Sequence, residues 1–133
     1  MAQNATFLSP ETIAKQPGFS LVVETTGPGR TIYVAGQLGL TLDGKLAPDF
    51  RAQAVQAFEN LKAALAAVGA GLDDVVKITN YLTDIRHLSV FREVRDQYVN
   101  TKAPPASTTV AISQLAREGA LFEVEAIAVL PPR

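Results

Sequence analysis

Two glutamates near the C-terminal end of the chain have a spacing that would let them take part in the same chemistry. Glu123 and Glu125 are two residues apart in a segment rich in Val, Ile and Ala, so on an extended strand they point to one face. A carboxylate can orient or activate water, and two close carboxylates can raise the pKa of one of them. A plainer role fits the same residues, because strand glutamates are mostly solvated and Lys77 could be a structural partner for Glu125.

The chain lacks the residues that several other kinds of site need. It has no cysteine, which excludes disulfides, thiolate nucleophiles and cysteine-based metal sites. His87 is the only histidine, and beside Asp84 at the expected start of a helix it is more typical of a capping or surface residue than of a catalyst. No Ser-His-Asp set can be placed, and residues 27–29 (Gly-Pro-Gly) lack the Lys and Ser/Thr of a phosphate loop. We therefore expect no cofactor and no metal.

Length and composition predict one domain that spans residues 1–133. The chain has 133 residues, of which 47% are hydrophobic, enough for a packed core. The net charge is −1 and no run of basic residues occurs, so we expect neither nucleic acid nor a membrane as a partner. We expect no signal peptide and no membrane span, and a cytoplasmic location by elimination.

The hydrophobic pattern predicts the element order β-β-(hairpin)-α-β-α-β-β. Strand-like segments occur at 19–25, 31–38, 75–83, 108–113 and 120–130, and Asp43-Gly44 suits a tight hairpin. Helical spacing predicts helices over 49–68 and 87–100, the first bounded by Pro48 and Gly69. Two helices against a mixed sheet indicate an α+β fold, a two-layer sandwich whose six-stranded sheet carries both helices on one face.

The alternation along the strands predicts how the two faces of the sheet are used. On the strand over 75–83, one face is expected to carry Val76, Ile78, Asn80 and Leu82, and the other Lys77, Thr79 and Tyr81. Two helices can cover only one face. The other mixes Thr, Tyr and Glu with Ile and Val, which is too apolar for solvent and too polar for a core. We therefore expect this face to be buried against other subunits.

Several motifs, taken in order, resemble those of the RidA (YjgF) family of imine deaminases, formerly described as endoribonuclease L-PSP. They are 33–37 (Tyr-Val-Ala-Gly-Gln), the helix over 53–69, 74–84, 104–110 (Pro-Pro-Ala-Ser-Thr-Thr-Val) and 122–129. The resemblance implies a chorismate-mutase-like homotrimer, with a central barrel of three sheets and small-molecule pockets between subunits. It also implies hydrolysis of enamines and imines, such as 2-aminoacrylate, to carbonyl compounds and ammonia without metal or cofactor.

Position by position, the resemblance implies a catalytic residue and a set of substrate-binding residues. They are Glu123, which would orient or activate water, and Ser107, Phe19, Ala35 and Gly36, although Phe19 fits simple core packing equally well. Thr109 joins the substrate-binding set because it shares a strand face with Ser107, and the alternative is a plain strand threonine. Ser107 stands where active members carry the arginine that clamps the substrate carboxylate, and Phe19 stands where they carry a tyrosine. One neutral hydroxyl cannot balance a carboxylate, and losing such a charged pair typically costs ~2–5 kcal/mol.

Three arginines are candidates to replace the missing clamp. Arg92 lies on the second helix, where relatives often have an uncharged polar residue, and Arg30 and Arg117 lie in turns near strand ends. Each is more typical of a solvated surface arginine than of a ligand clamp.

Three functions therefore remain open. The first is an enamine or imine deaminase, whose substrate need not carry a carboxylate. The second is a non-catalytic trimer that binds a small metabolite, which the missing arginine and tyrosine favour. The third is an endoribonuclease or translation inhibitor, against which the net charge and the lack of a basic patch argue.

Overall fold

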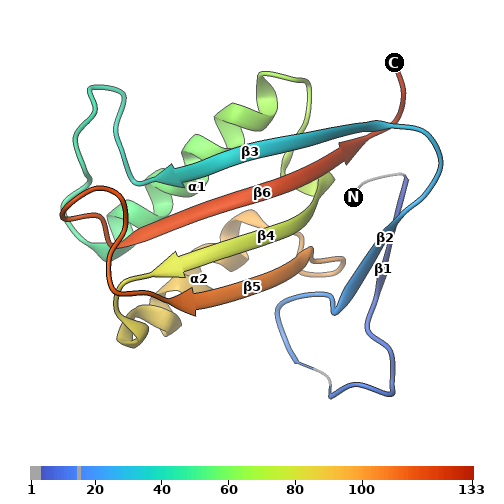
Figure 1. Ribbon diagram of the computed structural model, residues 1–133, viewed down its shortest axis with the longest axis horizontal. Helices are drawn as coiled ribbons and strands as arrows, with labels where there is room; N and C mark the ends of the chain where they lie inside the picture. The colour runs from blue at the N-terminus through green and yellow to red at the C-terminus, as the bar shows by residue number, and fades with distance from the viewer. Residues whose placement is uncertain (1–3, 15) are drawn as a thin grey trace.

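The protein places two helices on one face of a mixed four-stranded sheet, in a computed structural model that describes residues 4–14 and 16–133 (Figure 1). The strands lie in the order β3 (Arg30–Leu38), β6 (Phe122–Leu130), β4 (Val75–Leu82) and β5 (Ala106–Ala111). β4 and β5 are parallel, and β6 is antiparallel to both of its neighbours. The helices are α1 (Phe50–Ala66) and α2 (Leu88–Tyr98). The predicted α+β class and its two layers are confirmed.

α1 is bounded by the residues that flank it. The Asp49 carboxylate accepts a hydrogen bond from the backbone N–H of Ala52 at 2.8 Å and so caps the first turn. Gly69, with φ +79°, takes the left-handed conformation that ends the run. The predicted helix over 49–68 is confirmed to within two residues at each end. Its inner stripe consists of Phe50, Gln53, Ala54, Ala57, Phe58, Leu61 and Leu65.

The predicted helix over 87–100 is confirmed to within two residues at each end, as α2. A turn of 3₁₀ helix, η2 (Ile85–His87), precedes it, and the Asp84 carboxylate accepts from the Arg86 N–H at 2.9 Å. His87 makes no capping hydrogen bond through its side chain; its ring stacks on Phe50 with the centroids 4.3 Å apart. The capping role therefore belongs to Asp84, and His87 packs against α1. A similar turn, η1 (Leu72–Asp74), precedes β4.

The predicted single sheet of six strands is wrong in one respect. The described residues form the four-stranded sheet and a separate pair, β1 (Ala5–Leu8) with β2 (Val22–Thr25), and β1 is a strand that the sequence analysis did not predict. The expected strand over 19–25 is shortened because Ser20 bonds the β5 side instead: its hydroxyl donates to the carbonyl of Pro104 and its N–H to that of Pro105. A single parallel bridge between Ser20 and Ala106 links this segment to β5. The Asp43-Gly44 hairpin is also reduced to one bridge, between Leu40 and Leu46.

The core lies between the helices and the inner face of the sheet. The Phe122 ring contacts the rings of Phe50, Phe58 and Phe91, so β6 joins both helices. The predicted alternation is confirmed along β6 and most of β4. Val76 is the exception: the register shifts between Val75 and Lys77, and Val76 packs against Val129 in a small cluster apart from the main core.

In the part of the chain that the structure describes, no helix covers the outer face of the sheet, and β1 and β2 reach only one end of it. Ala5 and Val23 pack against the small cluster of Val76 and Val129 there. Elsewhere this face leaves Tyr33 largely exposed and Glu123, Glu125 and Ile127 half-buried. Among the helices of the described ranges, none combines the length and apolar character needed to cross a membrane.

Candidate functional site

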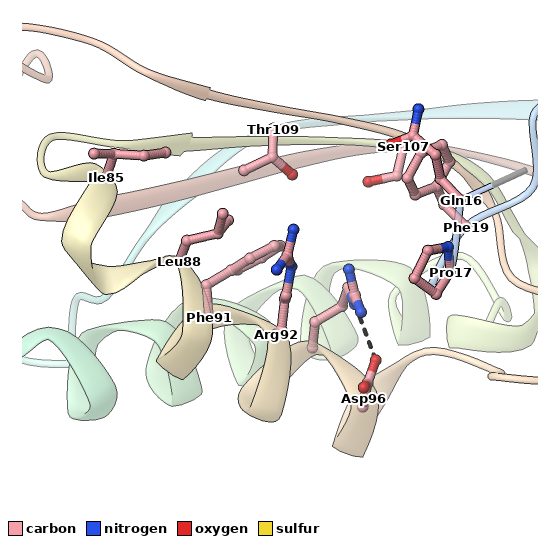
Figure 2. A pocket seen from close by; sticks show the side chains of 11 residues that line it. Gln16, Pro17, Phe19, Ile85, Leu88, Phe91, Arg92, Asp96, Ser107 and Thr109 are labelled. Carbon is pink, nitrogen blue, oxygen red and sulfur yellow. Dashed lines mark hydrogen bonds and ion pairs between the residues drawn. The ribbon is translucent and has the colours of Figure 1, made fainter. Parts of the chain in front are cut away.

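A cavity of about 500 Å³ opens between β5, α2 and the segment that precedes β2 (Figure 2). Its lining residues come from all three of these parts of the chain and from η2. They are Gln16, Pro17, Phe19, Ile85, Leu88, Phe91, Arg92, Arg95, Asp96, Ser107 and Thr109. Three of the predicted substrate-binding residues, Phe19, Ser107 and Thr109, therefore line one cavity.

A buried amide holds the two β5 hydroxyls in place. Asn80, which is 0% exposed, donates through Nδ2 to Ser107 Oγ and to Thr109 Oγ1, both at 3.2 Å. Because these hydroxyl oxygens accept from Asn80, their own hydrogens are free to donate into the cavity. The sequence analysis did not predict that Asn80 positions these two hydroxyls. The sequence did single Asn80 out, because it is the one amide on an otherwise apolar face of β4.

Two arginines three residues apart on α2 bring positive charge to the cavity. Arg92 extends from the helix toward Ser107 and Thr109 (Figure 2). Arg95 is only 8% exposed; its Nε donates to Asp96 Oδ1 at 3.0 Å, and its guanidinium lies 5.7 Å from the centroid of the Phe91 ring. Among the described residues that line the cavity, Arg92 and Arg95 are accompanied by one carboxylate, that of Asp96, so these side chains together carry one net positive charge.

Arg95 was not predicted as a site residue. It occurs four residues after Phe91 and seven after Leu88, which places it on the buried stripe of α2. A charged residue on a stripe that is otherwise apolar could have indicated that Arg95 is buried at a functional site. Gly18 leaves room for it, because an ideal Cβ on Gly18 would lie 2.5 Å from Arg95 Nη2.

Apart from Gln16, the remaining lining residues of the cavity are apolar and come from α2, η2 and the segment before β2. They are Phe19, Ile85, Leu88 and Phe91, together with Pro17. A volume of several hundred Å³ with a mostly apolar wall and a few converging polar groups is typical of a small-molecule site. The cavity thus suits a compact ligand with an anionic or hydrogen-bonding end and an apolar remainder.

Glu123 lies away from this cavity, on the uncovered face of the sheet. Burial, with a contribution from the neighbouring charge of Glu125, raises the pKa of the Glu123 carboxyl. Gly36 makes room for it, since an ideal Cβ on Gly36 would lie 2.6 Å from Glu123 Oε1. Ala35 is exposed beside Gly36. These three predicted residues therefore form a second group, on the face opposite Ser107 and Thr109.

The polar residues around Glu125 are paired differently from the prediction. Glu125 accepts a hydrogen bond from the Tyr81 hydroxyl, and this bond is the main cause that raises the pKa of Tyr81. Lys77 instead donates to Thr108 Oγ1 at 2.9 Å. Burial lowers the pKa of Lys77, and the charge of Glu125 opposes that shift. Glu125 thus acts on Lys77 through its charge, while its hydrogen bond comes from Tyr81.

The three candidate replacement arginines lie in different places. Arg92 lines the cavity, as described above. Arg30 donates through Nε to the carbonyl of Pro131 at 3.2 Å, at the far end of the sheet. Arg117 is exposed in the loop that precedes β6. Neither Arg30 nor Arg117 is among the residues that line the cavity.

Across residues 4–14 and 16–133, no three or more His, Asp or Glu side chains are grouped so that they could hold a metal ion.

Comparisons with known proteins agree with the fold and with the motifs. The sequence model of the endoribonuclease L-PSP family matches residues 11–130. A RutC family protein of Aquifex aeolicus is 33% identical over 113 residues, which cover 84% of this chain and 87% of that protein. A 2-iminobutanoate/2-iminopropanoate deaminase of Dermatophagoides farinae is 30% identical over 132 residues, covering 92% and 99% respectively.

The similarity extends to solved structures. A protein of unknown function from Yersinia pestis, YyfB of the conserved Rid protein family, superposes with a TM-score of 0.82 at 31% identity. The superposition covers 96% of this chain and 100% of that one.

Proposed function

The chain belongs to the RidA (YjgF) family, whose sequence model bears the name endoribonuclease L-PSP, and on this premise we propose that it hydrolyses a small enamine or imine to a carbonyl compound and ammonia. The observation that carries the proposal is the cavity that gathers Phe19, Ser107 and Thr109, residues that are far apart in the sequence. The name of the Dermatophagoides farinae relative supports the reaction class.

Hydrolysis of an imine requires few catalytic groups from the protein. An enamine first tautomerises to the imine, and a water oxygen then attacks the electrophilic imine carbon while one water proton passes to the nitrogen, which gives a carbinolamine. The remaining hydroxyl proton then passes to the nitrogen, and the C–N bond breaks to leave C=O and NH₃. In this scheme Glu123 accepts each of these protons from oxygen and returns it to nitrogen. A raised pKa suits the task, because it brings the carboxylate closer to the pH at which it can both accept and release a proton.

We place this chemistry in pockets shared by neighbouring subunits of a homotrimer. Within one chain Glu123 lies on the outer face of the sheet, whereas Ser107 and Thr109 face α2, so one chain cannot apply both groups to one substrate. A second copy that packs on the outer face could bring Glu123 to the mouth of a neighbour's cavity. The half-buried outer face supports such packing, since it is too apolar for solvent alone.

The test couples the protein to an amino-acid dehydratase that releases 2-aminoacrylate or 2-aminocrotonate. We expect the protein to accelerate 2-keto acid formation and Glu123→Gln to abolish that acceleration, while Glu118→Gln, in an exposed loop, keeps it. Light scattering on the same samples should give three times the mass of the chain. The proposal fails if the unmodified protein leaves the rate of keto-acid release unchanged.

A second candidate, a trimer that binds a metabolite without turning it over, is favoured by Ser107 and Phe19. Both positions lack the polar groups that active relatives carry there. This alternative predicts saturable binding of a 2-keto acid together with no acceleration in the coupled assay.

A further inference from the structure

Arg92 brings a cation into the cavity from α2, opposite the hydroxyls of β5. Arg92 extends from α2 into the space bordered by Ser107 and Thr109 (Figure 2). The hydroxyls of Ser107 and Thr109 border this space on the β5 side, so the Arg92 guanidinium enters it from the opposite side, that of α2.

The acidic neighbours of Arg92 are already engaged. Glu93 pairs with Arg51 at 2.9 Å, and Asp96, one turn further along α2, pairs with Arg95 at 3.0 Å. Within the part of the chain that the structure describes, no hydrogen bond or ion pair holds Arg92. An exposed helical arginine normally gains from an acid four residues away, and here Asp96 is taken by Arg95. The guanidinium of Arg92 therefore keeps its donors for a ligand.

Arg95 has a different role in the same wall. It is buried, bonded to Asp96 and packed against the Phe91 ring and Gly18, so its position is fixed. Its charge is partly balanced by Asp96. Together the two arginines leave the cavity with one positive charge to be compensated, and that charge favours an anionic ligand.

We propose that Arg92 is the carboxylate clamp of this protein, supplied from α2 in place of the family's β5 arginine. The Arg92 guanidinium pairs with the carboxylate of a small 2-keto or 2-imino acid, and Ser107 and Thr109 donate hydrogen bonds to it. The apolar tail of the ligand lies against Leu88 and Ile85. The inference rests on the proposed function only for the identification of this cavity as the ligand site.

Binding of 2-oxobutanoate, a stable keto acid, tests the clamp without any turnover. By titration calorimetry we expect Arg92→Gln to weaken binding roughly tenfold or more, and Arg92→Lys, which keeps the charge but loses the planar fork, to weaken it less. Arg117→Gln removes an arginine outside the cavity and should leave the affinity unchanged. Affinity for 2-oxobutanamide, the neutral amide, should respond little to Arg92→Gln, a contrast that a merely structural role would not produce.

The outcomes separate the clamp from the catalytic proposal. Equal affinity of the unmodified protein and the Arg92→Gln variant for 2-oxobutanoate overturns the clamp, even if the coupled assay shows turnover. Failure of the unmodified protein to bind 2-oxobutanoate overturns it as well. Arg92-dependent binding without turnover supports the clamp and refutes the deaminase.

Discussion

At the scale of single residues, the fold raises the pKa of Glu123, the residue proposed to transfer protons in the reaction. Burial and the nearby charge of Glu125 raise the pKa of its carboxyl, so the folded chain binds this proton more tightly than the unfolded chain does. The resulting stabilisation is fully present below the ordinary glutamate pKa of about 4.3 and is lost as the pH rises through the higher folded value.

Replacing Glu123 with Gln removes this titration. The variant should gain free energy of unfolding relative to the unmodified protein, and the gain should grow as the pH rises through that window and then level off. Urea denaturation at several pH values between about 4 and 7 measures the difference. For Glu118→Gln, at an exposed position, the difference in free energy of unfolding from the unmodified protein should not change with pH. A gain for Glu123→Gln that is independent of pH, or that grows on acidification, would contradict the assigned shift.

At the scale of elements, Gln53 ties α1 to the loops at one end of the sheet. It is 3% exposed; Nε2 donates to the carbonyls of Ala47 at 3.1 Å and Gly119 at 3.3 Å, and Oε1 accepts from the Leu121 N–H at 2.8 Å. One side chain thus satisfies three backbone groups, one from the loop before α1 and two from the segment that leads into β6.

Gln53→Ala leaves those backbone groups without their partner. We expect it to lower the free energy of unfolding by about 1–3 kcal/mol, because buried polar groups that lose a hydrogen bond keep their desolvation cost. Gln97→Ala, at an exposed position of α2, should change stability by no more than about 0.5 kcal/mol. Chemical denaturation of the two variants gives the comparison, and similar losses for both would show that the Gln53 hydrogen bonds contribute little.

Sequence periodicity predicts best the elements whose own hydrophobic pattern decides which face is buried. The inner stripe of α1 and the alternation of β6 are of this kind. The separation of β1 and β2 from the main sheet was not predictable locally, because it depends on Ser20 bonding to Pro104, which is 84 residues away. The same limit applies to the cavity: face alternation groups Ser107 with Thr109, but which side chains of α2 come near them depends on how that helix packs on the sheet, and this packing brings Arg92 into the cavity.

At the scale of the whole molecule, the two groups of site residues lie on opposite faces of one sheet. Ser107 and Thr109 lie with Ile78 and Asn80 on the side of the helices, and Glu123 lies with Tyr81 on the uncovered side. If the proposed trimer forms, each working site takes its cavity from one copy and its glutamate from the next. Such an arrangement lets two inactive variants complement each other, which a site within one chain does not allow.

Mixed oligomers therefore test the shared site directly. Glu123→Gln removes the carboxylate, and Ser107→Trp fills the cavity, so each variant alone should be inactive in the coupled assay. After joint unfolding and refolding at equal amounts, about one quarter of the sites should combine an intact cavity with an intact Glu123 from a neighbour and so recover activity. Mixing the folded oligomers without exchange is the control and should recover none. If jointly refolded oligomers of normal mass stay inactive, the glutamate and the cavity do not come from different copies, and the shared site is refuted.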